Sequence, residues 1–179
     1  MRSTLLLIGA LMSASLVSCQ TAPRTDAGKM DIRDAADTTL AEAQRNDPTL
    51  TPVLRNALGY AVFPTVGKGA IGVGGAYGKG TLYEQGAFVG YCDMTQGSIG
   101  LQLGGQGYSE IIAFSTLEAL DRFKTGNLAF DAQATAVALK SGAGANAKYA
   151  GGVAVFTMDE AGLMYEASIG GQKFSYQAR

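Results

Sequence analysis

The sequence predicts an α+β fold: a curved, mainly antiparallel, glycine-rich sheet of barrel-like shape, packed with a few short helices. The apolar residues first recur at helical spacing and, after Gly59, alternate as they do in strands. Glycine accounts for 25 of the 179 residues, about twice its usual share of roughly 7%. Because the helices come first and the strands then follow one another with short turns, we expect the strands to pair antiparallel.

Residues 1–18 are expected to be a lipoprotein signal peptide. Arg2 precedes an apolar run, Leu5 to Leu16, which is too short to span a bilayer as a mature helix. The run ends in LVSC, residues 16–19, which resembles a bacterial lipobox. The resemblance implies cleavage before Cys19 and acylation of that residue, with palmitate among the chains. Gln20, in place of the aspartate of an inner-membrane retention signal, implies the outer membrane, facing the periplasm; an ordinary secretory signal is the alternative.

Residues 19–28 are expected to be the lipidated Cys19 and a flexible tether, and residues 29–179 a single domain. The tether is polar and contains Pro23. Apolar residues at helical spacing predict a helix from Lys29 to Asn46, ended by Pro48. The exposed face of this helix is acidic, whereas helices that lie on membranes carry basic residues. We therefore expect it to pack on its own domain.

The elements that follow are predicted from caps, alternation and turn residues. Thr51 as N-cap, Pro52 in the first helical position and Gly59 as C-cap predict a second short helix. Strands are predicted over 60–64, 67–80, 81–85, 87–94, 98–106, 108–115, 151–158, 163–171 and 173–177, with a hairpin turn at 95–97 and another turn at 159–162. A capping box at 115–118 predicts a third helix through Lys124, ended by Gly126. Residues 131–140 fit either a helix or a strand.

The stretch GKGAIGVGGAYGKG, residues 67–80, opens with the GxGxxG pattern of dinucleotide-binding loops. Such a loop must open a helix, and the glycines that follow would each destabilise one by about 1 kcal/mol, so a nucleotide site is not expected. As a single strand, the stretch places Gly72, Gly74 and other small residues on one bare face. That face admits either a closely packed helix, which is favoured, or an acyl chain.

Several motifs together resemble the SYLF domain family. LRNALG, AVFP, the glycine stretch, GLQLGGQ and IGG occur in the family's order, at residues 54–59, 61–64, 67–80, 100–106 and 169–171. The resemblance covers roughly residues 47–176 and implies a lipid-binding domain, whose bacterial members are often envelope lipoproteins. The glycine-proline pair that is common in the family is replaced here by KSGAG, residues 140–144.

The candidate lipid-binding residues are Lys68 and Lys79, which flank the glycine stretch, with Gly72 and Gly74 on its bare face. The ammonium groups could meet phosphate head groups, although isolated lysines are more often solvated surface. Cys92 lies in an apolar run and is expected to be a buried, inert thiol.

The composition gives little support for an enzyme. The chain contains no histidine, the commonest general base and metal ligand, and we find neither GxSxG nor a metal-ligand spacing. No metal, other cofactor, nucleotide or nucleic acid is expected. The predicted function is that of a lipid-anchored, non-catalytic envelope protein whose domain binds phospholipid or the membrane surface and supports envelope integrity. The alternative is a scaffold lipoprotein that binds another envelope protein.

Overall fold

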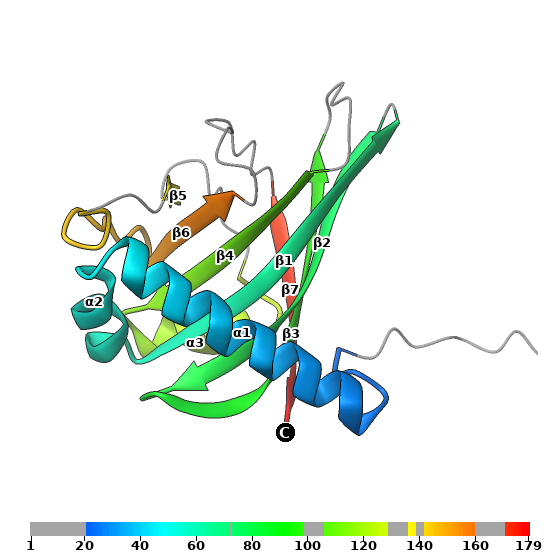
Figure 1. Cartoon of the computed structure of the whole chain (residues 1–179), viewed down its shortest axis with the longest axis horizontal. Helices are drawn as coiled ribbons and strands as arrows, with labels where there is room; N and C mark the ends of the chain where they lie inside the picture. Colours follow the sequence, from blue (N-terminus) through cyan, green and yellow to red (C-terminus); the bar gives the residue numbers. More distant parts are fainter. Residues whose placement is uncertain (1–20, 72, 99–105, 129–135, 139–141, 160–170) are drawn as a thin grey trace, which may run out of the picture.

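The computed structural model describes residues 21–71, 73–98, 106–128, 136–138, 142–159 and 171–179 (Figure 1). Its helices are α1 (Asp26–Asn46), α2 (Leu50–Asn56) and α3 (Leu117–Lys124). Its strands are β1 (Gly59–Ile71), β2 (Val73–Glu84), β3 (Ala87–Ser98), β4 (Gln106–Phe114), β5 (Ala136–Ala138), β6 (Val153–Asp159) and β7 (Gln172–Ala178). None of the helices in these ranges is both long enough and apolar enough to cross a membrane.

The described strands form one sheet in the order β5-β6-β4-β1-β2-β3-β7. All neighbours are antiparallel except β5 and β6, which are parallel. The predicted α+β fold with a mainly antiparallel sheet is therefore confirmed. The sheet is not closed, because its edge strands in the described part, β5 and β7, do not pair with each other.

The sheet curls strongly toward one of its faces, which we call the inner face. In a flat sheet β4 and β7 would lie four strand spacings apart, or about 19 Å. Instead, the side chain of Gln172 on β7 donates a hydrogen bond of 3.1 Å to the carboxylate of Glu110 on β4. The rings of Phe63 on β1 and Phe174 on β7 likewise lie 6.1 Å apart. The open sheet thus has the strong curvature that its glycines predict.

The inner face carries the larger hydrophobic core, which α3 covers. Phe123 of α3 lies between Phe114 and Phe174, 5.0 Å from each ring. An ion pair between Lys124 and Glu84 attaches the end of this helix to β2. The helix is therefore held to both the middle and the edge of the curled sheet.

The outer face is covered by α1 and α2 (Figure 1). Ala36 and Ala43 of α1 are completely buried, and these small side chains let the helix lie close to the strands. The Tyr83 hydroxyl on β2 donates a hydrogen bond of 2.8 Å to the carboxylate of Asp37 on α1. The prediction that this helix packs on its own domain is confirmed. It begins three residues earlier than predicted, at Asp26, because the hydroxyl of Thr25 caps it.

The second helix is correctly predicted, but not its caps. Thr51 lies inside α2, and Thr49 occupies the N-cap position without a side-chain capping bond. The Thr49 hydroxyl instead donates a hydrogen bond of 2.6 Å to the carboxylate of Asp47. Gly59 does not end the helix but begins β1, where an added Cβ would meet the Tyr83 carbonyl oxygen at 2.9 Å.

The glycine stretch is not the single strand that the sequence predicts. It contains the end of β1 and the start of β2, which pair with each other from Gly67↔Tyr77 to Ile71↔Val73. The first part continues the strand predicted at 60–64, so β1 runs through Pro64. The register shifts between Phe63 and Val66, and such an irregularity accommodates a proline that has no N–H to donate to the ladder.

The hairpin turn predicted at 95–97 is also wrong. Thr95, Gln96 and Gly97 lie within β3 and pair with β2, and the first two pair with β7 as well. Pairing on both sides keeps this polar segment extended, a tertiary effect that local turn propensity does not include. The turn between β2 and β3 lies at Gln85 and Gly86, both with positive φ, as in the type I′ turns favoured in hairpins.

The third helix is confirmed, with its N-cap one residue later than predicted. The hydroxyl of Thr116, rather than that of Ser115, accepts from the Ala119 N–H, and Gly126 ends the helix with φ 72°. Of the ambiguous residues 131–140, the described part is the strand β5. The strands at 151–158 and 173–177 are confirmed as β6 and β7. Those predicted at 98–106 and 163–171, and the turn at 159–162, fall mostly outside the described residues.

Candidate functional site

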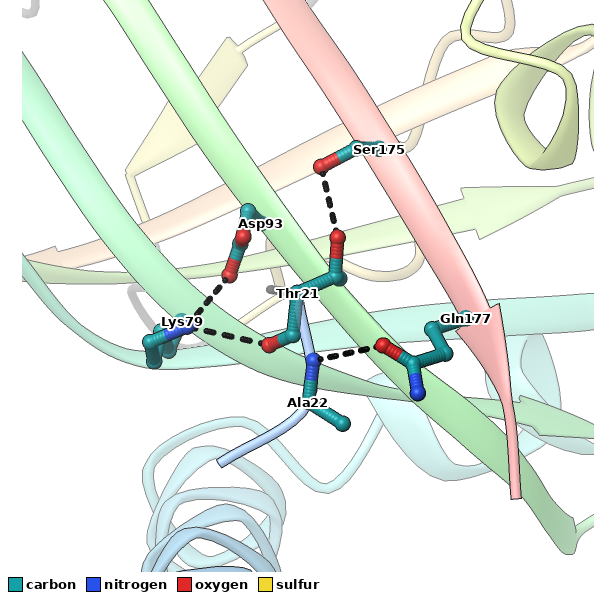
Figure 2. A network of polar contacts seen from close by, with 6 residues as sticks. All are labelled: Thr21, Ala22, Lys79, Asp93, Ser175 and Gln177. Carbon is teal, nitrogen blue, oxygen red and sulfur yellow. Dashed lines mark hydrogen bonds and ion pairs between the residues drawn. The ribbon is translucent and has the colours of Figure 1, made fainter. Parts of the chain in front are cut away.

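Lys79 on β2 lies at the centre of a polar network on the outer face (Figure 2). Its ammonium group donates a hydrogen bond of 3.1 Å to the carboxylate of Asp93 on β3 and one of 3.0 Å to the backbone carbonyl of Thr21. Lys79 and Asp93 are directly opposite each other in the β2–β3 register. One of the two predicted lysines is therefore engaged with its own protein.

The segment before α1, residues 21–25, lies across this network, and we call it the N-terminal strap. The Thr21 hydroxyl donates a hydrogen bond of 3.2 Å to the Ser175 hydroxyl on β7, and the Ala22 N–H donates one of 3.1 Å to the Gln177 amide oxygen (Figure 2). Ala22 is only 6% exposed. The sequence predicts a flexible tether through residue 28, but the strap is bonded to the sheet and residues 26–28 belong to α1.

The ion pair in the network is partly withdrawn from water. The Asp93 side chain is 9% exposed and that of Lys79 is 34% exposed. Burial raises the pKa of Asp93, and the hydrogen bond and positive charge of Lys79 offset only part of that rise. Burial lowers the pKa of Lys79, but its contacts with Tyr77 and Asp93 outweigh that effect and raise it. At neutral pH Lys79 is therefore a charged donor that holds the strap.

A surface groove of about 360 Å³ lies beside the network. Pro23 and Ile32 line it from the strap and α1, and Pro64 and Lys79 line it from β1 and β2. Asp31 also lines the groove, so its lining combines apolar residues with one acidic and one cationic side chain.

The other predicted site residues are not brought together with Lys79. Lys68 lies in β1, where its backbone is opposite Ala76 of β2 and Gln106 of β4. Gly74 lies in β2, opposite Ala70 and Ser98. Cys19 and Gly72 lie outside the described residues.

The sequence leaves two candidates to cover the bare glycine face, a closely packed helix or an acyl chain. Neither covers the described part of that face. Gly78 and Gly80 are buried on the inner side of β2, away from α1. A Cβ at Gly80 would meet the Phe63 ring at 2.8 Å, and one at Gly78 would meet the Val66 side chain at 2.9 Å. The neighbouring strand β1, rather than a helix or a lipid, therefore fills the space above these two glycines.

A second polar cluster lies on the inner face and is not predicted from the sequence. Glu110 and Gln172 are completely buried, and the Tyr108 hydroxyl lies 3.4 Å from the Gln96 amide oxygen. Burial, with a smaller contribution from the Glu110 carboxylate, raises the pKa of Tyr108 well above its usual range. The Tyr108 phenol therefore stays protonated, and the cluster joins β3, β4 and β7 across the curl.

The buried carboxylate of Asp47 accepts several hydrogen bonds from the backbone around it. It accepts hydrogen bonds from the backbone N–H groups of Gly142 (3.0 Å), Gly144 (2.6 Å) and Thr49 (3.0 Å). Burial alone would raise the pKa of Asp47, but these bonds and the Thr49 hydroxyl outweigh it and lower the pKa. Asp47 thus fastens the 142–147 segment to the corner between α1 and α2.

The described side chains do not form an evident metal-binding site. No cluster of three or more acidic, cysteine or histidine side chains that could hold a metal occurs in the described ranges. Cys92 is buried as predicted. Burial, together with the nearby Asp93 charge, raises the pKa of its thiol well above the usual value, which disfavours the reactive thiolate.

Comparison with known proteins finds a relative in the bacterium Aeromonas veronii, the protein Beta cell expansion factor A. It is 29% identical to this chain over 155 residues, which cover 82% of this chain and 56% of the relative. The chain therefore spans about half the length of the curated relative it matches. No protein-family model matches the chain.

Proposed function

We propose that this protein is a lipid-anchored envelope lipoprotein whose SYLF-like domain binds phospholipid or the membrane surface without catalysis. The observation that carries the proposal is the LVSC lipobox at residues 16–19, directly before a strap that is bonded to the domain. The order of the SYLF motifs and the resemblance to Beta cell expansion factor A support a related domain. The outer membrane, facing the periplasm, is the proposed location.

The anchor is tested by changing Cys19→Ala in the full chain and expressing both forms in bacteria supplied with radiolabelled palmitate. The wild-type protein should incorporate label and sediment with membranes, because several acyl chains anchor a protein stably. The variant should lose the label and should be either released from membranes or mis-processed with its leader retained. A Cys92→Ala variant is the matched control and should keep the label. Incorporation that survives Cys19→Ala would contradict the proposal.

Lipid binding by the domain needs a separate measurement. The purified chain that begins at Gln20, without the leader and Cys19, should carry phospholipid in native mass spectrometry and sediment with vesicles of phosphatidylethanolamine and phosphatidylglycerol. A lipid-free mass without vesicle binding, together with one specific cross-linked envelope protein, would instead support the alternative function of a scaffold lipoprotein.

A further inference from the structure

The strap brings the proposed anchor close to one particular part of the sheet. Thr21 is bonded to the row of residues formed by Lys79, Asp93 and Ser175, which are opposite one another on β2, β3 and β7. Cys19 precedes Thr21 by two residues. Since consecutive Cα atoms are about 3.8 Å apart, the two Cα atoms lie within about 8 Å of each other.

The adjacent row on the same face is open to solvent. Gly67, Tyr77, Thr95 and Lys173 are opposite one another on β1, β2, β3 and β7, and all four are exposed. This exposed row lies two residues along the strands from the row beneath Thr21, a distance of about 7 Å. Tyr77 is 48% exposed, one of the few large apolar side chains exposed in the described structure.

Followed from Ala22 back to Thr21, the strap runs toward the exposed row. Ala22 is bonded to Gln177 and Thr21 to Ser175, so from Ala22 to Thr21 the chain advances along β7 toward Lys173. Because the Cys19 Cα can lie no more than about 8 Å from that of Thr21, an acyl chain on Cys19 can reach a bilayer that contacts this row.

The chemistry of the exposed row fits a membrane surface. Tyrosine is enriched at the membrane–water interface, where its ring and hydroxyl meet different environments. Lysine side chains near the surface are attracted to anionic head groups.

We infer that the strap acts as a fixed mount and not as a tether, holding the exposed row formed by Gly67, Tyr77, Thr95 and Lys173 against the head groups of the bilayer that receives the Cys19 acyl chains. This inference rests on the proposed function, because it requires acylated Cys19. It assigns the membrane-facing side of the domain to the part of the outer face of β1, β2, β3 and β7 that α1 leaves exposed. The opposite side, with α3, then faces away from the membrane.

The inference is tested with acylated full-length protein in vesicles of phosphatidylethanolamine and phosphatidylglycerol that contain a head-group spin-labelled lipid. A fluorescent label is attached to a cysteine introduced by Thr95→Cys or, as the matched control on α3, by Glu118→Cys; both positions are exposed, and Cys92 is buried. The label at position 95 should be quenched several-fold more strongly than the label at position 118.

Inserting a ten-residue Gly-Ser segment between Gln20 and Thr21 should remove most of this difference, because such a segment adds a flexible span of about 17 Å. The same segment added after Arg179 is the control and should leave the difference unchanged. Equal quenching at positions 95 and 118 in acylated, vesicle-bound protein without the insertion would overturn the fixed mount while leaving the anchor intact. Absence of acylation would overturn both proposals.

Discussion

At the scale of single residues, two kinds of residue are critical for the fold: glycines where backbones and rings approach closely, and a few buried polar residues. Gly80 lies under the Phe63 ring, and Asp47 satisfies three backbone N–H groups at once. Gly80 contacts the neighbouring strand β1, and Asp47 joins Gly142 and Gly144 to its near neighbour Thr49, so a single substitution at either position should disturb tertiary contacts.

Asp47→Asn should lower the free energy of unfolding at pH 7 by about 2–3 kcal/mol. The change replaces one carboxylate oxygen with an NH2 group, which then faces a backbone N–H group and cannot accept its hydrogen bond. The pKa of Asp47 is lowered in the folded state. Its stabilising contribution is therefore present above the unfolded pKa of 3.8 and is lost as the pH falls through the folded value. Urea denaturation at pH 7 and pH 3 measures both effects. Asp121→Asn, at an exposed carboxylate of α3, should show neither. An equal loss for Asp47→Asn at the two pH values would contradict the mechanism.

Gly80→Ala should destabilise the protein by about 1–3 kcal/mol, because the added methyl group must displace the Phe63 ring or the β1 backbone. Gly67→Ala is the matched control: it lies in the paired strand β1, and an added Cβ meets nothing within 4 Å. That change should be neutral or slightly stabilising. Thermal unfolding of the two variants measures the difference, and similar melting temperatures would argue against close packing at Gly80.

At the scale of elements, the strap and the register between strands create the polar network around Lys79. Alternation along each strand places Lys79, Asp93 and Ser175 on the outer face, but only the β2–β3–β7 register makes them neighbours. The strap then joins this row by backbone and side-chain bonds.

Lys79→Met should lower the free energy of unfolding by about 1–3 kcal/mol, because the nearly buried Asp93 carboxylate loses its positive partner. It should also speed hydrogen exchange at the Ala22 N–H, since the strap loses a bond. The double change Lys79→Met with Asp93→Leu should recover part of the stability, as no unpaired charge then remains, but not the protection of Ala22. Unchanged exchange at Ala22 in both variants would show that Lys79 does not hold the strap.

At the scale of the whole molecule, the curl of the sheet determines which strands meet and where the helices pack. It brings β4 and β7 together on the inner face, gives α3 a concave surface to cover, and leaves the convex outer face to α1, α2 and the strap. The orientation proposed for the anchored domain follows from this division into two faces.

The contact between β4 and β7 can be measured by a double-mutant cycle. Glu110→Ala and Gln172→Ala should be non-additive in free energy of unfolding by about 0.5–3 kcal/mol, as for groups in contact, although four strand spacings separate them in the sheet. Glu110→Ala combined with Gln177→Ala, an exposed residue on the opposite face of β7, should be additive within about 0.5 kcal/mol. Additivity in both pairs would be inconsistent with the curl.

The sequence by itself determined the fold class, the three helices and most strands, because periodicity and caps are local: the capping box at 115–118 places the start of α3 within one residue, and Gly126 marks its end. The tertiary structure decided the features that depend on contacts between segments distant in the sequence. It kept Thr95, Gln96 and Gly97 extended between two strands, and it folded the glycine stretch back on itself as a hairpin. It also bonded the expected tether to the sheet through Lys79, Ser175 and Gln177. Those contacts depend on strand register and on the curl, and a single sequence specifies neither through local preference alone.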